Sequence, residues 1–127
     1  MIVIDASAMV EALVGRQPSD EPLEALAGDV DAPHLLDVEV LSALRGLLLG
    51  GRLSTTLAEQ ALQNFQSMSI TRHPMTTLTG RVWQLRHQFT TYDASYIALA
   101  EALGAPLYTC DAKLATRGHT ADVRLLD

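Results

Sequence analysis

The sequence predicts an α/β protein: a three-layer sandwich in which helices cover both faces of a mostly parallel central sheet. Short β-branched or apolar runs, such as Met1 to Ile4 and Pro106 to Thr109, alternate along the chain with segments whose apolar residues recur at helical spacing. The first run has no polar residue, as a strand buried on both faces requires. Without repeats or a linker, residues 1–127 are expected to form one domain.

The first half of the chain is expected to begin with a strand from Met1 to Ile4 that ends at Asp5. The elements expected next are a helix Ala6 to Val14 stopped by Gly15 and Pro18, a short helix Ser19 to Leu26, a brief strand Val30 to Pro33, a helix Leu35 to Leu49 stopped by Gly50-Gly51, and a helix from Ser54, Thr55 or Thr56 to about Met68. Thr56 and Glu59 have the spacing of a capping box.

The second half continues the alternation. The elements expected here are a strand Ser69 to Arg72, a helix Thr77 to about His87, a helix that begins at Thr90, Thr91 or Asp93, a strand Pro106 to Thr109, a short helix Asp111 to Arg117, and a strand Val123 to Leu126. The helix near Asp93 places Ile97, Ala100 and Leu103 on one face and ends at Gly104.

Two carboxylates follow the two clearest strands. Asp5 comes directly after the first, and Asp111 follows Pro106 to Cys110. Ligands of open α/β sheets bind at the carboxyl ends of the strands, so these side chains could meet there. Helix capping is the alternative for each acid, because Asp is favoured just before a helix. Asp93 carries the same ambiguity.

Glu39 is not explained by capping. It lies between Val38 and Val40 in a helix with little polar surface around that turn. A solvated helix face is one interpretation. A carboxylate in such apolar surroundings is seldom buried unless it is paired or bound to a cation, so a metal is the other.

Convergence of Asp5, Glu39, Asp93 and Asp111 would raise their pKa values by mutual repulsion and would call for a divalent cation. Oxygen-only ligands select Mg²⁺ or Mn²⁺, and such sites hydrolyse phosphodiesters through metal-activated water. The sequence therefore predicts a hydrolytic metal site at the sheet edge.

Charge argues against a protein that holds nucleic acid by overall attraction, since the net charge is −6 and the pI is about 5.0. A nuclease is compatible with this charge if metal ions invert the local field and a few arginines line the approach. Arg45, Arg86 and Arg117 are the candidates, with plain surface solvation as the alternative for each.

Other sequence features limit the protein's class and location. Cys110 is the only cysteine, which excludes an intramolecular disulfide and a cysteine zinc cage, and we expect it to pack in the core. No apolar stretch is long enough to span a membrane. The first residues lack the pattern of a signal peptide, so a cytoplasmic location is expected.

Four motifs resemble the PIN-domain family, and within it the VapC-type toxins of bacterial toxin–antitoxin pairs. The motifs are Val3-Ile4-Asp5-Ala6-Ser7-Ala8, Asp37-Val38-Glu39-Val40-Leu41-Ser42-Ala43-Leu44, Thr91-Tyr92-Asp93-Ala94-Ser95-Tyr96-Ile97-Ala98-Leu99-Ala100-Glu101 and Leu107-Tyr108-Thr109-Cys110-Asp111. Each motif is weak alone, but their order and separations across nearly the whole chain are specific.

The resemblance implies a parallel-sheet sandwich, endoribonuclease activity and a magnesium or manganese site. Asp5, Glu39, Asp93 and Asp111 would be ligands, with Ser7 and Thr109 in support. The alternative role for Ser7 is to cap a helix. The alternatives for Thr109 are to cap a helix or to pack within its strand. Some relatives carry a further acid after the fourth. Here the segment Ala112 to Thr116 supplies none, so one or two metals remain open.

Family members also commonly form homodimers and are silenced by a small antitoxin whose tail enters the acidic groove. We expect this antitoxin to place a basic side chain, an arginine above all, among the acids, because a guanidinium bridges two carboxylates. The apolar residues that could anchor its helix are Met9, Leu13, Leu23 and Leu26, with core packing as the alternative for each.

Three other functions share some of these sequence features. A PIN nuclease of ordinary RNA maturation would share the chemistry but lack an antitoxin. A phosphate-accepting receiver domain calls for adjacent acids after the first strand and a late lysine, whereas Asp5 precedes Ala6 and the last strand offers Arg124. A non-catalytic interaction module remains if the acids never converge.

Overall fold

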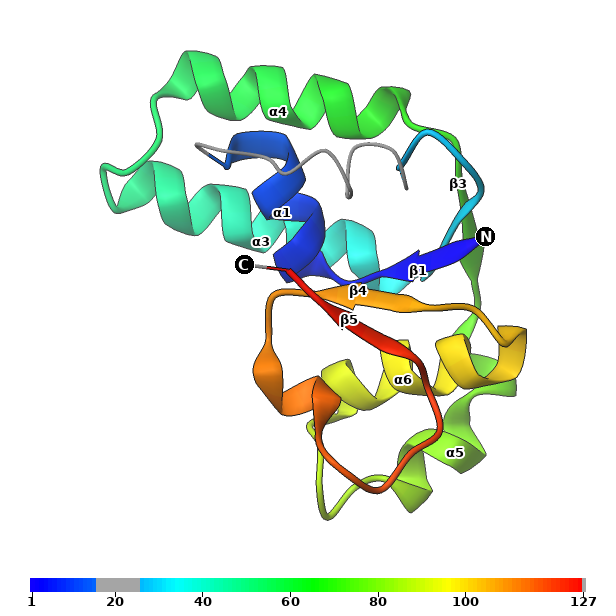
Figure 1. The fold of residues 1–127 in the computed structure, drawn as a ribbon. Helices are drawn as coiled ribbons and strands as arrows, with labels where there is room; N and C mark the ends of the chain where they lie inside the picture. The colour runs from blue at the N-terminus through cyan, green and yellow to red at the C-terminus, as the bar shows by residue number, and fades with distance from the viewer. Residues whose placement is uncertain (16–25, 127) are drawn as a thin grey trace.

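The computed structural model describes residues 1–15 and 26–126. It has a five-stranded sheet with the order β3-β2-β1-β4-β5, and every neighbouring pair is parallel (Figure 1). The strands are β1 (Ile2–Ile4), β2 (Val30–Pro33), β3 (Ile70–His73), β4 (Leu107–Thr109) and β5 (Val123–Leu125). The predicted α/β fold with a parallel sheet is confirmed.

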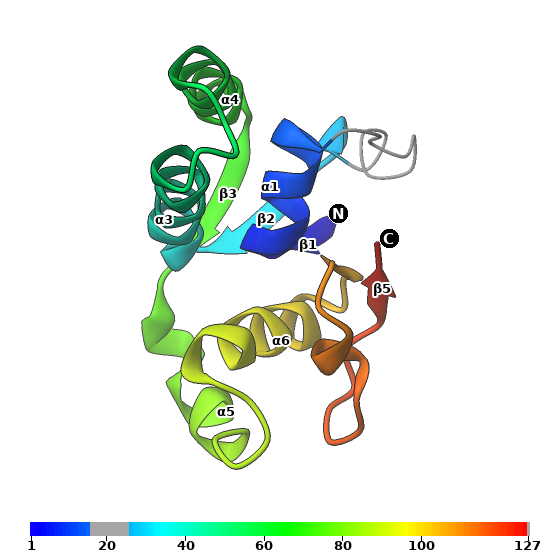
Figure 2. The same ribbon diagram turned by 90° about the vertical axis from the view of Figure 1, so that its left-hand side faces the viewer.

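Helices cover both faces of the sheet, as Figures 1 and 2 show. One layer holds α1 (Ala6–Val14), α3 (Leu35–Leu49) and α4 (Thr55–Ser67), and the other holds α5 (Thr79–Gln84) and α6 (Thr91–Leu103). Val3, Leu36, Ile97 and Leu107 are fully buried, so the core is continuous from one layer through the sheet to the other.

The strand order reverses between β1 and β4. From β1 the chain adds β2 and then β3 on one side, whereas β4 and β5 lie on the other. Because all strands are parallel, their carboxyl ends lie along one edge, and a reversal of strand order opens a crevice there. Asp5 and Asp111, which follow β1 and β4, flank this position.

The helix caps resolve alternatives that the sequence left open. Ser54 caps α4 by accepting a hydrogen bond from the Leu57 backbone N–H, so the capping box predicted for Thr56 and Glu59 is wrong. Thr90 caps α6 by accepting one from the Asp93 backbone N–H. Asp93 is therefore not the cap and its carboxylate remains available in the first turn.

Two predicted helices are shorter in the structure. In place of Thr77 to His87 there are a 3₁₀ turn, η1 (Met75–Thr77), and α5; the chain then turns so that Leu85 and Phe89 both enter the core. In place of Asp111 to Arg117 there is η2 (Ala112–Ala115), followed by Gly118 at φ 114°. The helix predicted for Ser19 to Leu26 lies almost wholly outside the described residues. Within the described part of the chain, no helix is long and apolar enough to cross a membrane.

The end of α3 reverses the chain direction through a glycine. Gly51 has φ 74°, and its N–H donates to the Leu48 carbonyl. The Arg52 N–H donates to the Leu47 carbonyl at 2.9 Å, which completes a Schellman motif. This motif returns Arg52 to the side of the last helical turn.

Glu101 joins three segments on the other layer. Its carboxylate accepts two hydrogen bonds from Arg81 of α5, at 2.7 and 3.0 Å, and two from the N–H and hydroxyl of Thr120, before β5. These donors, chiefly Arg81, lower the pKa of Glu101 to about 2.

We predict that Glu101→Gln lowers the free energy of unfolding at neutral pH by about 1–3 kcal/mol, because charge-assisted bonds are lost and an amide donor faces other donors. The folded-state pKa lies below the ordinary value of 4.5, so the stabilisation is present above that pH and is lost as the pH falls from there towards about 2. Urea unfolding across this range tests it. The exposed Glu59→Gln is the matched control; an equal effect of both changes would contradict the assignment.

Candidate metal-binding acid cluster

Asp5 is buried where β1 ends, with 6% of its surface exposed. Its Oδ1 accepts hydrogen bonds from the Ser7 hydroxyl at 2.7 Å and the Ala8 backbone N–H at 3.0 Å. Its Oδ2 accepts one from the Thr109 hydroxyl at 2.5 Å. Asp5 is thus both the N-cap of α1 and an acid at the edge of the sheet. Helix capping and a place in the acid cluster are therefore compatible at this residue.

The same two hydroxyls hold the chain that follows β4. The Thr109 hydroxyl oxygen accepts from the Asp111 N–H, and that of Ser7 accepts from the Cys110 N–H, both at 3.0 Å. Ser7 and Thr109 therefore lie between the acids after β1 and β4, where the sequence analysis expected them. Orienting an acid through its hydrogen bonds is what residues around a metal ligand do.

Cys110 is half-buried and packs against the core from the turn after β4, so its predicted core packing is confirmed in part. Burial, followed by the charge of Asp5, raises the pKa of its thiol. A raised pKa disfavours the thiolate, which is the nucleophilic form of a cysteine.

Glu39 faces the cluster from α3 and is half-buried. The hydroxyl of Tyr96, on α6, donates to Glu39 Oε1 at 2.7 Å. This hydrogen bond joins the two helical layers across the carboxyl end of the sheet. Sequence reasoning missed Tyr96, although its place three residues after Asp93 puts both side chains on one face of a helix.

The remaining two acids are Asp93, on α6, and Asp111, in the turn after β4. Asp93 lies in the first turn of α6, and Asp111 Oδ1 accepts a hydrogen bond from the Lys113 N–H at 3.0 Å. Burial raises the pKa of Asp93, and the charges of Asp111 and Asp5 raise it further, while the Thr90 side chain and then the positive charge of Lys113 oppose them. Lys113 is a second residue that sequence reasoning missed.

The four acids affect one another electrostatically. Burial raises the pKa of Asp5, with a further contribution from Asp111; burial also raises that of Glu39, with contributions from Asp5 and Asp93. Within residues 1–15 and 26–126, no group of three or more His, Cys, Asp or Glu side chains forms a ready metal cage. The acids therefore lie within range of mutual repulsion but outside a single coordination shell.

The donor chemistry suits a hard divalent cation. All candidate ligands are carboxylates, which prefer Mg²⁺ or Mn²⁺ over zinc. Among the described donors, Asp5 Oδ1 accepts two hydrogen bonds and Oδ2 accepts one. A carboxylate has about four lone-pair sites, so one site on Oδ2 remains for a cation.

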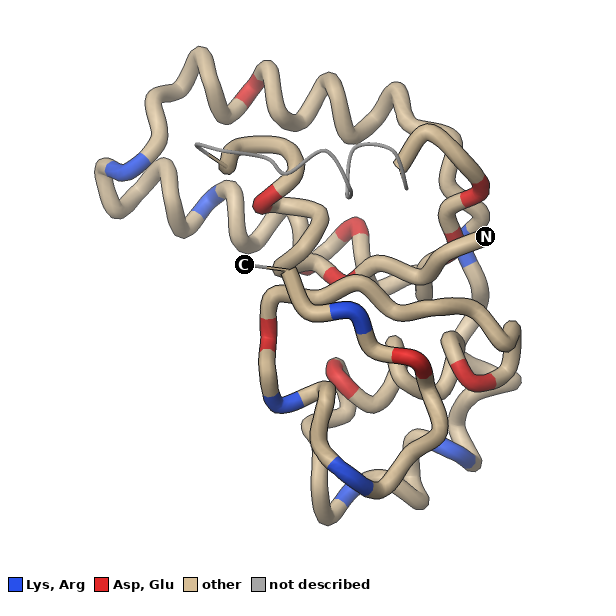
Figure 3. Tube along the Cα trace, viewed as in Figure 1, with Lys and Arg blue, Asp and Glu red and all other residues tan. Residues whose placement is uncertain are grey.

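The predicted arginines are not part of this cluster. Arg45 is exposed on α3, Arg117 is exposed after η2, and the Arg86 guanidinium stacks 4.6 Å from the centre of the Trp83 ring. Figure 3 shows basic positions spread over both helical layers rather than gathered on one face. A role for these three in RNA binding stays a prediction.

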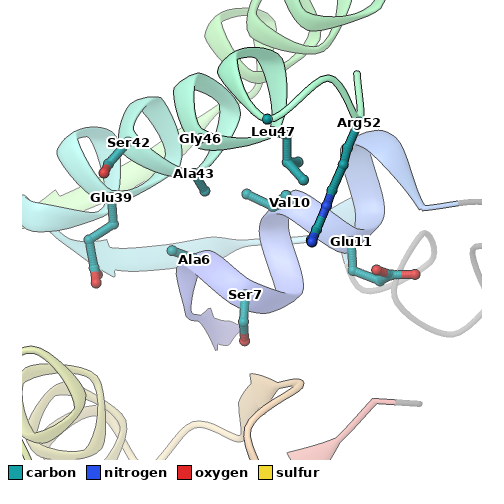
Figure 4. Close-up of a pocket in the computed structure, with 11 residues that line it drawn as sticks. Ala6, Ser7, Val10, Glu11, Glu39, Ser42, Ala43, Gly46, Leu47 and Arg52 are labelled. Carbon is teal, nitrogen blue, oxygen red and sulfur yellow. The ribbon is translucent and has the colours of Figure 1, made fainter. Parts of the chain in front are cut away.

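A groove between α1 and α3 opens from the acid cluster and has a volume of about 750 Å³ (Figure 4). Ser7 and Glu39 line its end at the cluster, and Arg52 lines it at the other end. Arg52 is the third residue that sequence reasoning missed. The signal was present, because a residue after Gly50-Gly51 is turned back by a Schellman motif.

The apolar residues predicted to anchor an antitoxin helix differ in their burial. Met9 is fully buried in the core, so its proposed exposure to a partner is wrong. Leu13 and Leu26 are partly buried against the core. Leu23 lies outside the described residues.

Comparisons with known proteins identify the family of this chain. A family model of the PIN domain matches residues 2–119. The chain is 40% identical to Ribonuclease VapC12 of Mycobacterium tuberculosis, over 99% of each sequence, and 40% identical to Ribonuclease VapC9 of the same species, over 94% of this chain and 92% of the relative. A crystal structure of VapBC2 from Rickettsia felis, bound to a DNA fragment from their promoter, has a TM-score of 0.74 at 18% identity and covers the whole of both chains.

Burial of the Glu39 carboxylate, with repulsion from Asp5 and Asp93, predicts that Glu39→Gln stabilises the metal-free protein at neutral pH, by about 0.5–1 kcal/mol after allowance for solvent screening. Glutamine keeps an oxygen that can accept the hydrogen bond from the Tyr96 hydroxyl. It removes the negative charge, which the charges of Asp5 and Asp93 repel. Because the folded-state pKa lies above the ordinary 4.5, the difference should be present at neutral pH and vanish below pH 4.5.

Urea unfolding in excess chelator, at neutral and at acidic pH, measures this difference. Glu59→Gln, on the exposed side of α4, is the control for loss of a carboxylate. A loss of stability in Glu39→Gln at neutral pH would show that the hydrogen bond from Tyr96 to the carboxylate outweighs the cost of burial and repulsion at this position.

Proposed function

The chain belongs to the PIN-domain family, and from this premise we propose that it is a magnesium- or manganese-dependent endoribonuclease acting as the toxin of a toxin–antitoxin pair. The observation that carries the proposal is the convergence of Asp5, Glu39, Asp93 and Asp111 at the reversal of strand order. The relatives named as VapC ribonucleases support the activity, and the VapBC2 structure supports a protein partner. The cytoplasm, where such a substrate and partner occur, is the proposed location.

Because the four acids lie outside a single coordination shell, they would hold the ion partly through the waters that Mg²⁺ retains, with Asp5 contributing its remaining Oδ2 site. When bound, the ion lowers the pKa of a coordinated water and offsets negative charge on the phosphodiester. Asp5 is kept in place by Ser7 and Thr109, and Glu39 by Tyr96. These fixed hydrogen bonds orient the carboxylates before substrate arrives, so little reorganisation is needed during reaction.

Lys113 supports a site with one ion. It lies in the segment where some relatives carry a further acid, and its positive charge opposes part of the rise in the pKa of Asp93, where an acid would add to that rise. A cation of the chain itself at this position supplies part of the charge that a second metal would bring.

Two alternatives differ in specific ways. A PIN nuclease of RNA maturation would have the same site, and the absence of a neighbouring antitoxin gene would favour it. The receiver domain is contradicted by the fold, since flavodoxin-like domains have the strand order 2-1-3-4-5 and this sheet has β3-β2-β1-β4-β5.

We predict that the purified protein cleaves single-stranded RNA only with Mg²⁺ or Mn²⁺, and that Asp5→Asn, Asp93→Asn or Asp111→Asn reduces the rate by at least about 100-fold. Each change removes a ligand charge while keeping the side-chain shape. Cleavage of a labelled RNA, with and without chelator, measures this, and circular dichroism confirms that each variant is folded. Full activity in chelator, or in Asp93→Asn, would exclude the metal site.

The partner is expected to be a small antitoxin that places an arginine among the four acids, because a guanidinium offers five donors and offsets their repulsion. We predict that expression of the chain alone arrests growth, that arrest requires Asp93, and that the product of an adjacent small gene relieves it. A homodimer would present two such sites to a two-fold partner assembly. If the active protein is harmless and no neighbour binds it, the RNA-maturation nuclease is the correct function.

A further inference from the structure

The groove between α1 and α3 is continuous with the acid cluster but is not explained by metal binding. Ser7 and Glu39 belong to both, and from them the groove follows the two helices to Arg52 (Figure 4). Its middle is apolar, lined by Val10, Ala43 and Leu47. From Glu39 to Leu47 the helix rises about 12 Å, at about 1.5 Å per residue.

Arg52 supplies a positive charge at the far end. Its side chain extends between the two helices in Figure 4, and no carboxylate of the described residues lies within 4.0 Å of its guanidinium. The carboxylate of Glu11, the nearest acid on the groove wall, is folded back against Gly15 at the end of its own helix. Among the described residues, therefore, no acid occupies the donors of this guanidinium.

Gly46 keeps the groove open. It lies in the interior of α3, where glycine is unfavourable relative to alanine, and a Cβ built on it would meet no atom within 4 Å. A side chain at this position would project into the groove instead of into the protein. The open space thus depends on the absence of one side chain.

We propose that this groove binds the RNA segment on one side of the cleaved bond, with Arg52 contacting a backbone phosphate and the apolar middle receiving a base or ribose. The inference rests on the proposed ribonuclease function. A strand of stacked nucleotides advances about 3.4 Å per residue, so the groove spans about three nucleotides between the cluster and Arg52. Positive charge beyond an acidic, metal-binding end is the complement of a phosphodiester chain that enters the site. In an acidic protein, such a local cation is what guides a polyanion.

Two variants test the groove independently. Gly46→Leu fills it, and Gly80→Leu is the matched control, because Gly80 lies in α5 and a Cβ there also meets nothing within 4 Å. Arg52→Ala removes the phosphate contact, and Arg124→Ala, on β5, is its control. Each is made in the parent and in the cleavage-inactive Asp93→Asn background, where binding of a fluorescein-labelled single-stranded oligoribonucleotide is followed by anisotropy.

We expect Gly46→Leu to weaken RNA binding by on the order of tenfold or more while its resistance to urea stays at or above that of the parent. Arg52→Ala should weaken binding and reduce the slope of log affinity against log salt by about 0.7, the value for one phosphate contact on a single strand. Gly80→Leu and Arg124→Ala should leave both quantities unchanged.

RNA cleavage by the parent protein distinguishes failure of the groove assignment from failure of the proposed function. If the parent does not cleave RNA, the proposed function fails. If it does, but Gly46→Leu and Arg52→Ala bind RNA as the parent does, the groove assignment alone is overturned. It is also overturned if the two variants keep RNA affinity and lose only neutralisation by the adjacent gene's protein, since the groove would then be a protein-binding surface.

Discussion

The buried carboxylate of Asp5 is the group around which this site is arranged. A carboxylate with 6% exposure needs hydrogen-bond donors, and it takes them from Ser7, the start of α1 and Thr109 of the neighbouring strand. This is possible only because β1 pairs directly with β4, although the two are far apart in sequence. The same hydroxyls hold the turn after β4, so the position of Asp111 depends on the environment of Asp5.

The acids are kept together against their mutual repulsion. Burial and neighbouring charge raise the pKa values of Asp5, Glu39 and Asp93, which means that the ionised cluster destabilises the protein without a cation. The fold holds the cluster together through the edge of a parallel sheet, the hydrogen bonds of Ser7 and Thr109 to Asp5, and the hydrogen bond from Tyr96 to Glu39. A functional site that lowers stability is common, because binding needs charges that folding alone would avoid.

Neighbouring residues of similar chemistry have different roles in this structure. Asp37 and Glu39 are two residues apart on α3, yet Asp37 forms a bidentate pair with Arg72 of β3, at 2.7 and 2.8 Å, while Glu39 turns to the cluster. The first pair fixes the edge strand, and the second acid faces the crevice. At the other end of α3, a Schellman motif sets Arg52 over the groove. Helix geometry thus determines which charges belong to the site.

The sequence by itself determined the fold class, the strand exits at Asp5 and Asp111, the full extent of α3 and the candidate acids, because these depend on local periodicity, breakers and residue type. It could not show that Thr90 rather than Asp93 caps α6, that the segments after Thr77 and Asp111 form only short turns, or that Met9 is buried. Helix spacing and the glycine stop gave local signals for Tyr96 and Arg52, but the roles of Tyr96, Lys113 and Arg52 were settled only in three dimensions. Their roles depend on contacts between segments far apart in the chain, and only the pairing of β1 with β4 and the packing of α1, α3 and α6 around the sheet edge bring those segments together.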